Sequence, residues 1–227
     1  MAAGCIEPVP HDLPGNVELW HLDLDQYRFD PDAAIFSDDE RSRAGRFLFD
    51  DDRRRFLAAH HALRQVLGLA LDRQPGALAF ETGAHGKPRL SEGGGLEFNL
   101  SHSFQQCLIG VSAERPIGVD VEVVQRVVDA GALARRHFTR GEIEQWERAA
   151  APDRARAFLQ VWTRKEACLK ALGSGLSVPP GKVEAGCDDR ARRVVVELES
   201  RRVQVELASI SLTGVAVGAV ALTGAVA

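Results

Sequence analysis

The apolar positions of the chain follow a helical period in two long stretches. Between residues 37 and 71 they recur at intervals of three and four, which is the spacing of one face of an α-helix. A second stretch, over about 153–172, shows the same period and ends at Gly173, a residue typical of helix C-terminal caps. The pattern therefore predicts largely helical structure over both stretches.

A further helix is predicted to begin at Thr139. Thr139 and Glu142 have the spacing of a capping box, in which each side chain bonds the other residue's backbone N–H. Phe138 and Ile143 stand where a hydrophobic staple would lie. These local signals predict a sharply defined helix start.

The remaining apolar residues form short or alternating runs, which are typical of β-strands. A turn over 83–88 and the three glycines at 93–95 separate two of these runs. We predict strands over 78–82, 96–100, 107–111, 117–123, 194–198 and 203–207, and a buried strand within 214–227.

A polar, proline-containing segment at 112–116 separates two apolar runs near the middle of the chain. Domain boundaries fall in such segments, and 227 residues suit two lobes of about 110 residues each. We therefore predict an α+β fold with an N-terminal lobe over 1–113 and a C-terminal lobe over 114–227. A single larger domain is the alternative.

Composition and charge exclude several classes of protein. The hydrophobic fraction of 45% and the charged fraction of 26% are typical of a soluble globular chain, and the net charge of -4 offers no global basic field for nucleic acid. The four cysteines lack the spacing of a zinc site or a disulfide framework, and 214–227 is too short to span a bilayer. The first residues lack the pattern of a signal peptide. We expect a cytoplasmic protein that binds neither nucleic acid nor membrane.

Two carboxylates lie close together in the predicted strand 117–123. Because side chains alternate across a strand, Asp120 and Glu122 share one face, with Val119 and Val121 on the other. Paired carboxylate oxygens are ligands that magnesium prefers. The alternative is an ordinary solvated strand face.

The predicted helix over 153–172 carries another acid beside its apolar stripe. Glu166 and Lys170 lie one turn apart at the edge of that stripe, either at a site or as an ordinary surface ion pair. Lys165 projects near the centre of the stripe, so it must snorkel, pair with an acid or reach a phosphate.

Further basic and hydroxyl groups suit phosphate oxygens. Lys87 lies in a Gly-Lys-Pro turn, and Ser101 and His102 end the Phe-Asn-Leu-Ser-His-Ser stretch at 98–103. A turn lysine and a strand-end cap are the ordinary alternatives. The many arginines of 41–64 form either a phosphate patch or a solvated mixed-charge face. His60 and His61 are interpreted as packing or solvent-facing residues.

The motifs occur in a characteristic order. Gly-Lys-Pro at 86–88 precedes Phe-Asn-Leu-Ser-His-Ser at 98–103 and Ile-Gly-Val-Asp-Val-Glu at 117–122. Trp-Thr-Arg-Lys-Glu-Ala-Cys-Leu-Lys-Ala-Leu-Gly-Ser-Gly-Leu follows at 162–176. In this order and spacing the chain resembles the Sfp-type 4'-phosphopantetheinyl transferases.

That resemblance implies a pseudo-twofold pair of similar α+β lobes, with coenzyme A and magnesium, or manganese, in the cleft between them. It assigns the metal to Asp120, Glu122 and Glu166, and the diphosphate to Lys170. It places Lys87, Ser101 and His102 along coenzyme A. Basic residues near the N-terminal helix would bind its 3'-phosphate. The candidates here are Arg43, Arg46 and Arg55, with Lys165 as a further basic group.

The implied reaction moves 4'-phosphopantetheine from coenzyme A to a serine of an apo carrier protein and releases 3',5'-ADP. Glu166, directly or through a metal-bound water, would take the serine proton, with Lys170 and Asp120 as its catalytic partners. Arg135, Arg136 and Arg140 either steer an acidic carrier or only solubilise a loop. Two lobes in one chain suit a monomer. The alternatives are a non-catalytic coenzyme A or carrier-binding protein and a metal-dependent phosphohydrolase.

Overall fold

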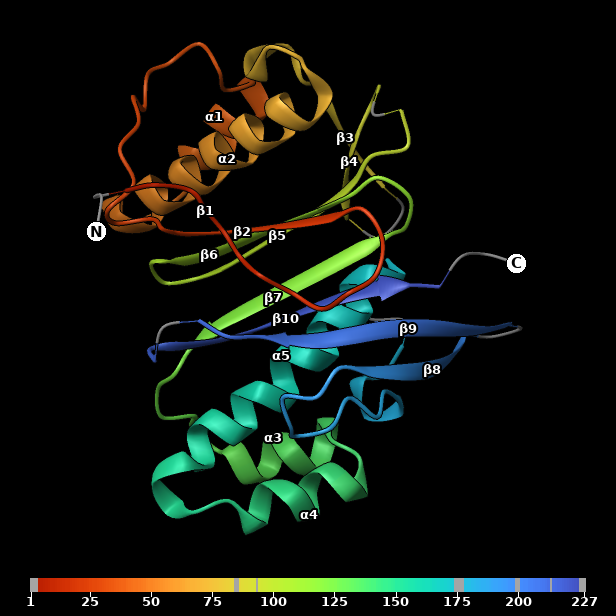
Figure 1. Ribbon diagram of the computed structural model, residues 1–227. Coiled ribbons are helices and arrows are strands. Elements are labelled where there is room, and N and C mark those ends of the chain that lie inside the picture. Colours follow the sequence, from red (N-terminus) through yellow and green to blue (C-terminus); the bar gives the residue numbers. More distant parts are fainter. Residues whose placement is uncertain are drawn as a thin grey trace.

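The computed structural model describes residues 4–83, 86–92, 94–173, 178–198, 201–212 and 214–224, and these residues form a mixed α/β fold (Figure 1). The α-helices are α1 (Asp38–Ala44), α2 (Asp50–Leu71), α3 (Ala130–His137), α4 (Arg140–Arg148) and α5 (Arg154–Leu172). The strands are β1 (Glu7–Pro8), β2 (Val17–Asp23), β3 (Phe80–Thr82), β4 (Pro88–Leu90), β5 (Glu97–Ser103), β6 (Gln106–Ser112), β7 (Ile117–Val123), β8 (Arg192–Leu198), β9 (Arg201–Ile210) and β10 (Ala216–Thr223). Short 3-10 helices occur at Pro75–Ala77, Ala151–Asp153 and Pro180–Lys182.

Two four-stranded antiparallel sheets organise the molecule. The first sheet has the strand order β1-β2-β6-β5, and the second sheet has the order β7-β10-β9-β8. In Figure 1, α1 and α2 lie above the first sheet, while α5 packs on the second sheet with α3 and α4 below it. The mixed α/β class is thus confirmed. The pseudo-twofold relation and the lobes 1–113 and 114–227 stay predictions.

Three apolar layers hold these elements together. Ala58 and Ala62 of α2 pack with Phe98 of the first sheet, and Ala167 of α5 packs with Leu207 of the second sheet. A third cluster lies between the two sheets, where Leu108 and Leu19 pack with Ile117, Val119 and Val220. Burial of this apolar surface is the main force that fixes the order of the layers.

In the C-terminal half of the chain, the predicted helix start and helix end agree well with the structure. Thr139 N donates to Glu142 at 2.7 Å and Glu142 N to Thr139 at 3.3 Å, so the capping box is confirmed. Gly173 caps α5 with a φ of 62°.

The stretch 37–71 is largely helical, as predicted, and it consists of two helices. It is split into α1 and α2 at residues 45–49, where Gly45 ends α1 and Phe49 precedes α2. A capping box of Ser37 and Glu40 starts α1. Phe47 therefore leaves the apolar face that helical spacing gave it and is largely exposed. Helical periodicity does not detect a short break whose flanking helices both present apolar faces.

The predicted strands are all present, with bounds that agree for 117–123 and differ by at most three residues for the other strands of stated bounds. The strand expected within 214–227 is β10, and residues 225–227 lie outside the described residues. The turn expected over 83–88 is closed by Gly83 N donating to the Lys87 carbonyl at 2.9 Å, although residues 84 and 85 are not described. The triple glycine likewise includes one residue, 93, outside the described part.

Two glycines let the layers approach closely. A side chain at Gly110 of β6 would clash with Val119 and Ile117 of β7, so this glycine brings the two sheets together. A side chain at Gly118 of β7 would clash with the backbone of Ala167 and Ala171 in α5. β7 therefore packs closely against β6 on one side and against α5 on the other.

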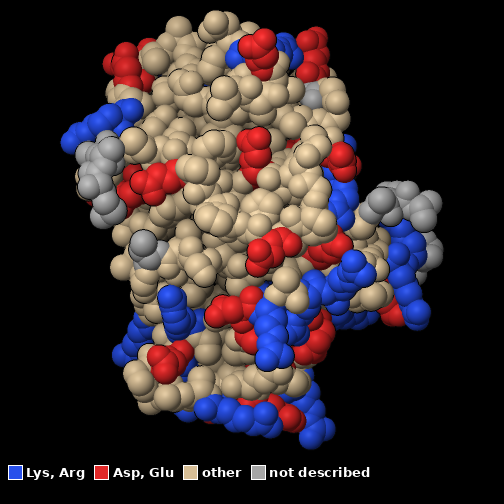
Figure 2. Space-filling model, viewed as in Figure 1, with Lys and Arg blue, Asp and Glu red and all other residues tan. Residues whose placement is uncertain are grey.

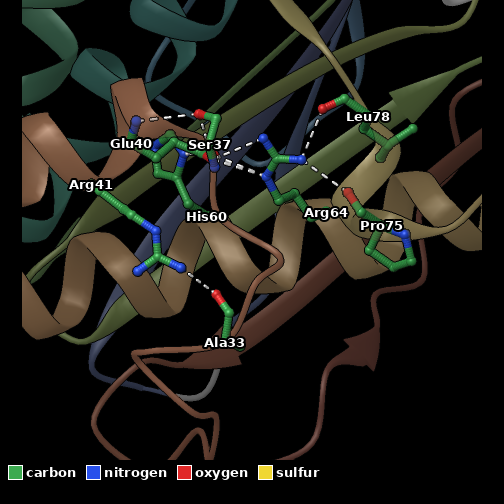
Figure 3. A network of polar contacts seen from close by, with 8 residues as sticks. All are labelled: Ala33, Ser37, Glu40, Arg41, His60, Arg64, Pro75 and Leu78. Carbon is green, nitrogen blue, oxygen red and sulfur yellow. Dashed lines mark hydrogen bonds and ion pairs between the residues drawn. The ribbon is translucent and has the colours of Figure 1, made fainter.

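A buried ion pair joins α1 to α2 (Figure 3). Glu40 is 5% exposed, and one of its oxygens lies 2.8 Å from a guanidinium nitrogen of Arg64. His60 Nδ1 lies 2.8 Å from the other oxygen, and Arg64 also donates to the carbonyls of Pro75 and Leu78, each at 2.9 Å. Burial alone would raise the pKa of Glu40, but the hydrogen bonds from His60, Arg64 and Ser37 outweigh it and lower the pKa from 4.5 to about 2.

We predict that Glu40→Gln lowers the free energy of unfolding by about 3 kcal/mol at pH 7. Because the folded pKa is depressed, this stabilisation is present above pH 4.5 and is lost as the pH falls toward 2. Urea unfolding of both proteins between pH 7 and pH 2 measures the difference. Glu92→Gln is the control, since Glu92 forms an exposed pair with Arg73 at 3.5 Å and should change stability by less than about 0.5 kcal/mol. A difference that persists unchanged at pH 2 would contradict the prediction.

Candidate functional site

The site is built where β5 of the first sheet runs beside β7 of the second sheet. Because the two strands belong to different sheets, side chains rather than a backbone ladder join them here. The amide oxygen of Asn99 accepts a hydrogen bond of 2.8 Å from the backbone N–H of Val119, and both groups are buried. This buried bond holds β7 in register beside the Phe-Asn-Leu-Ser-His-Ser stretch.

We call this side-chain contact between β5 and β7 the seam. Asp120 lies at its centre. Its Oδ1 accepts from the Ser101 hydroxyl at 2.8 Å and from the Lys170 ammonium at 2.6 Å. Lys170 also donates to Ser101 at 3.0 Å and to the Val119 carbonyl at 3.2 Å. Burial raises the pKa of Asp120, although Lys170 and Ser101 act in the opposite direction. Strand β5, strand β7 and helix α5 thus meet at one carboxylate.

Two further carboxylates face Asp120. Ser103 donates to Glu122 at 2.6 Å. Burial raises the pKa of Glu122, and the negative charge of Asp120 raises it further. Burial likewise raises the pKa of Glu166, followed by the charges of Asp120 and Glu122. Asp120, Glu122 and Glu166, which we call the acid cluster, therefore repel one another when all three are ionised.

The acid cluster has the chemistry of a cation site. Oδ2 of Asp120 is buried and has no hydrogen-bond partner among the described residues. A buried, unpaired carboxylate oxygen is costly unless a cation or donor reaches it, and divalent magnesium prefers such oxygens. Within the described ranges no three acidic, histidine or cysteine side chains are gathered tightly enough to hold a metal ion. The three-ligand set accordingly stays a prediction.

Basic groups extend from the acid cluster toward α2. The pKa of His102 is lowered, first by burial and then by the positive charges of His60, Lys170 and Arg55. We call Arg55, His60, His102 and Lys170 the basic band. Arg55 is already paired with Asp25 through two hydrogen bonds of 2.8 Å.

His60 has the packing role expected from the sequence, and only its link to His102 was not predicted. Its ring packs against Phe56, with centroids 4.2 Å apart, and its Nδ1 is bound by Glu40. The signal for this packing was present, because Phe56, His60 and Arg64 follow each other at intervals of four on one helix face.

The other predicted basic residues lie in different surroundings. Arg43 lies over the Phe56 ring at 5.2 Å, next to the basic band, and Arg46 is exposed and donates only weakly to Ser42 at 3.4 Å. Lys87 donates to the Ile117 carbonyl at 2.9 Å. It also lines a cavity of about 430 Å³ at the C-terminal end of α5.

Lys165 does not join this group. Its side chain is 0% exposed and lies 2.6 Å from the equally buried carboxylate of Glu142. The same ammonium also donates to the carbonyls of Pro180 and Val183. Of the three possibilities weighed for Lys165, pairing with an acid is the one observed, because Glu142 reaches back from α4 into the core. We therefore omit Lys165 from the phosphate-binding residues.

Comparisons with known proteins match both halves of the chain. Residues 116–220 match the family model of the 4'-phosphopantetheinyl transferase superfamily, and residues 20–114 match that of the 4'-phosphopantetheinyl transferase N-terminal region. The chain is 39% identical to the 4'-phosphopantetheinyl transferase HetI of Nostoc sp., over 73% of this chain and 72% of that protein. It is 37% identical to the putative 4'-phosphopantetheinyl transferase slr0495 of Synechocystis sp. (70% of this chain, 66% of that protein) and 26% identical to the 4'-phosphopantetheinyl transferase Sfp of Bacillus subtilis (64% of each).

In the described part of the chain, no helix is both long and apolar enough to cross a bilayer.

We predict that Lys165→Met lowers the free energy of unfolding by about 3–5 kcal/mol, because it leaves the buried Glu142 carboxylate without its cation. Since Lys165 lies outside the basic band, the ligand affinity of the folded fraction should not change. Urea unfolding measures the first effect, and calorimetric titration of the folded variant with coenzyme A measures the second. Arg140→Met is the matched control, because Arg140 makes an exposed pair with Glu144. A stable Lys165→Met protein with weakened affinity would contradict the assignment.

Proposed function

The chain belongs to the 4'-phosphopantetheinyl transferase superfamily, and from this premise we propose that it transfers 4'-phosphopantetheine from coenzyme A to a serine hydroxyl of an apo carrier protein. The products are the holo carrier and 3',5'-ADP. The main support for the proposal is that Lys170 and Ser101 both bond Asp120 of the acid cluster at the seam between the two sheets.

Magnesium, or manganese in its place, would be held by Asp120, Glu122 and Glu166 and would supply positive charge to the diphosphate oxygens. The buried and unpartnered Oδ2 of Asp120 supports this role, as does the mutual repulsion of the three carboxylates. Lys170 is the charge that balances Asp120 in the present arrangement.

Lys170 and Ser101 would bind and orient the diphosphate of coenzyme A. Negative charge builds on the leaving phosphate when the phosphopantetheinyl group departs, so a nearby ammonium lowers the barrier. Lys170 is suited to this because its ammonium lies at the edge of the core, partly exposed, with Ser101 at 3.0 Å.

Glu166 would take the proton of the incoming serine hydroxyl, either directly or through a water molecule. The charges of Asp120, Glu122 and Lys170 all act on Glu166, which supports a position of this carboxylate next to a phosphoryl group held by Lys170 and Ser101. A half-buried position excludes part of the bulk water from this group.

The 3'-phosphate of coenzyme A would bind at the α2 end of the basic band. The charges of His60 and Arg55 act on His102 there, and Arg43 lies over the ring of Phe56. Arg46 is more peripheral. Lys87 would contact the nucleotide from the other end of β5, at the cavity near the end of α5.

The carrier would dock from the solvent side of the seam. Exposed Arg135 and Arg136 on α3 are free to steer an acidic carrier, whereas Arg140 is paired with Glu144 at 3.0 Å. Figure 2 shows many Lys and Arg side chains over the lower part of the molecule, where α3 and α4 lie, with Asp and Glu among them. One chain supplies every residue of the proposed site, so we propose a monomer, acting in the cytoplasm.

Incubation with coenzyme A, magnesium and a purified apo acyl carrier protein, followed by intact-mass measurement, tests the proposal. We expect the carrier to gain the mass of phosphopantetheine with the wild-type enzyme. Glu166→Gln should slow the gain by at least about 100-fold, because the acceptor for the serine proton is lost. Glu197→Gln, at an exposed position of β8, is the matched control and should be fully active.

Two other outcomes would contradict the proposal. Cleaved coenzyme A without a heavier carrier would indicate a phosphohydrolase. Bound but unchanged coenzyme A, seen with apo acyl and peptidyl carriers alike, would indicate a binding protein.

We predict that His60→Asn lowers kcat/KM for coenzyme A by roughly 10- to 100-fold, as expected for the loss of a charged hydrogen bond to phosphate. Activity with 3'-dephospho-coenzyme A, which lacks that phosphate, should change much less. Paired kinetics with the two substrates measure the ratio. His61→Asn is the matched control, since His61 bonds the Tyr27 hydroxyl at 2.9 Å inside an aromatic cluster and should affect stability but not the ratio. Equal losses with both substrates would contradict the assignment.

A further inference from the structure

Phe104 has an unusual backbone conformation in the turn between β5 and β6. Ser103 pairs with Gln106 across the hairpin, so Phe104 and Gln105 form a two-residue turn. The φ of Phe104 is 50°, and Gln105 is not among the residues with positive φ. A two-residue turn with positive φ only at its first position is the type that favours glycine there. A bulky side chain at this position is strained.

The turn is held firmly by its neighbours. Leu24 N donates to the Gln105 carbonyl at 2.6 Å, and His21 Nε2 lies 2.8 Å from the Gln106 side-chain oxygen. The strain therefore belongs to a fixed part of the fold. A strained residue that persists in such surroundings points to a function when it has no structural reason.

The two remaining non-glycine residues with positive φ in the described chain have this conformation for structural reasons. Asp72 caps the C-terminus of α2, where a left-handed residue is common, and Asp129 precedes α3. Aspartate also tolerates this conformation far better than phenylalanine. Phe104, by contrast, is 50% exposed and so contributes little to the core.

Phe104 lies directly after the last hydroxyl that binds the acid cluster. Along β5, Glu97 is near Lys87, Ser101 binds Asp120 and Lys170, and Ser103 binds Glu122. The end of β7 is next to the hairpin, since Val123 N donates to the Ser103 hydroxyl at 3.3 Å. Phe104 is therefore just beyond the end of the seam opposite Lys87.

A second exposed apolar residue lies at the same end of β7. Val124 N, one residue after β7, donates to the Val215 carbonyl at 2.8 Å, and Val215 is 52% exposed. Phe104 and Val215 thus give the outer end of the seam an apolar rim.

We propose that Phe104 is an apolar contact for the carrier protein, beside its acceptor serine. This inference rests on the proposed function, in which Lys170 and Ser101 hold the diphosphate of coenzyme A and the acceptor serine must approach past Glu122. About half of a phenylalanine surface, on the order of 100 Å², is available there. That is far below the roughly 800 Å² per partner of a stable interface, so it suits a transient substrate contact rather than a second copy of this chain.

Phe104→Gly tests the proposal because glycine relieves the strain while removing the contact. We expect KM for an apo acyl carrier protein to rise about tenfold or more, with KM for coenzyme A within about twofold of wild type. The thermal midpoint should not fall, because glycine adopts this φ freely. Phe104→Tyr should keep KM for the carrier within about twofold. Asp72→Gly is the matched control for a change at a left-handed residue and should leave both KM values unchanged.

Binding of a carrier whose acceptor serine is replaced by alanine separates this inference from the proposed function. We expect wild type to bind it and Phe104→Gly to bind it about tenfold more weakly. If wild type transfers the group but Phe104→Gly binds this carrier as tightly as wild type does, the Phe104 contact is refuted and the proposed function stands. A raised KM for coenzyme A instead would place Phe104 against the pantetheine arm and overturn the carrier assignment. If wild type neither transfers to nor binds the carrier, both proposals fall.

Discussion

The side-chain seam between β5 and β7 is the interaction on which the rest of the site depends. Asn99 holds the backbone of β7, and the hydroxyls of Ser101 and Ser103 hold Asp120 and Glu122. No backbone ladder joins these two strands in the described sheets, so each of these bonds fixes the register between the sheets. Without that register the acids of β7 would not meet the hydroxyls of β5 or the lysine of α5.

Buried carboxylates have different surroundings in the site and in the rest of the fold, which we call the framework. In the framework, Glu40 is fully engaged by Arg64, His60 and Ser37, and Glu142 by Lys165 and three backbone N–H groups. In the site, one buried oxygen of the acid cluster has no partner among the residues that the structure describes. Satisfied pairs anchor helices to one another, whereas an unsatisfied buried oxygen is costly unless a donor or cation reaches it. This contrast supports the proposal that similar residue types have structural roles in one place and chemical roles in another.

The contrast also explains where sequence reasoning succeeded and failed. Asp120 and Glu122 were recognised as neighbours because strand alternation is local. Lys165 was assigned to phosphate because its acid partner lies 23 positions away on another helix. The link between His60 and His102 could not be predicted, because the two residues come from distant parts of the chain. The position of the break between α1 and α2 has no signal in the apolar spacing, which continues on both sides of it.

The sequence by itself determined the secondary structure of most of the chain, the caps at Thr139 and Gly173, the family resemblance and the acids on one strand face. Each of these depends on residues close together along the chain, where periodicity and spacing carry the information. Only the tertiary structure decided which charges are buried in pairs, which basic groups face His102, and that Phe104 is strained at the end of the seam. Those properties arise when sheets and helices pack, because burial and charge interaction depend on distance in space rather than on separation along the chain.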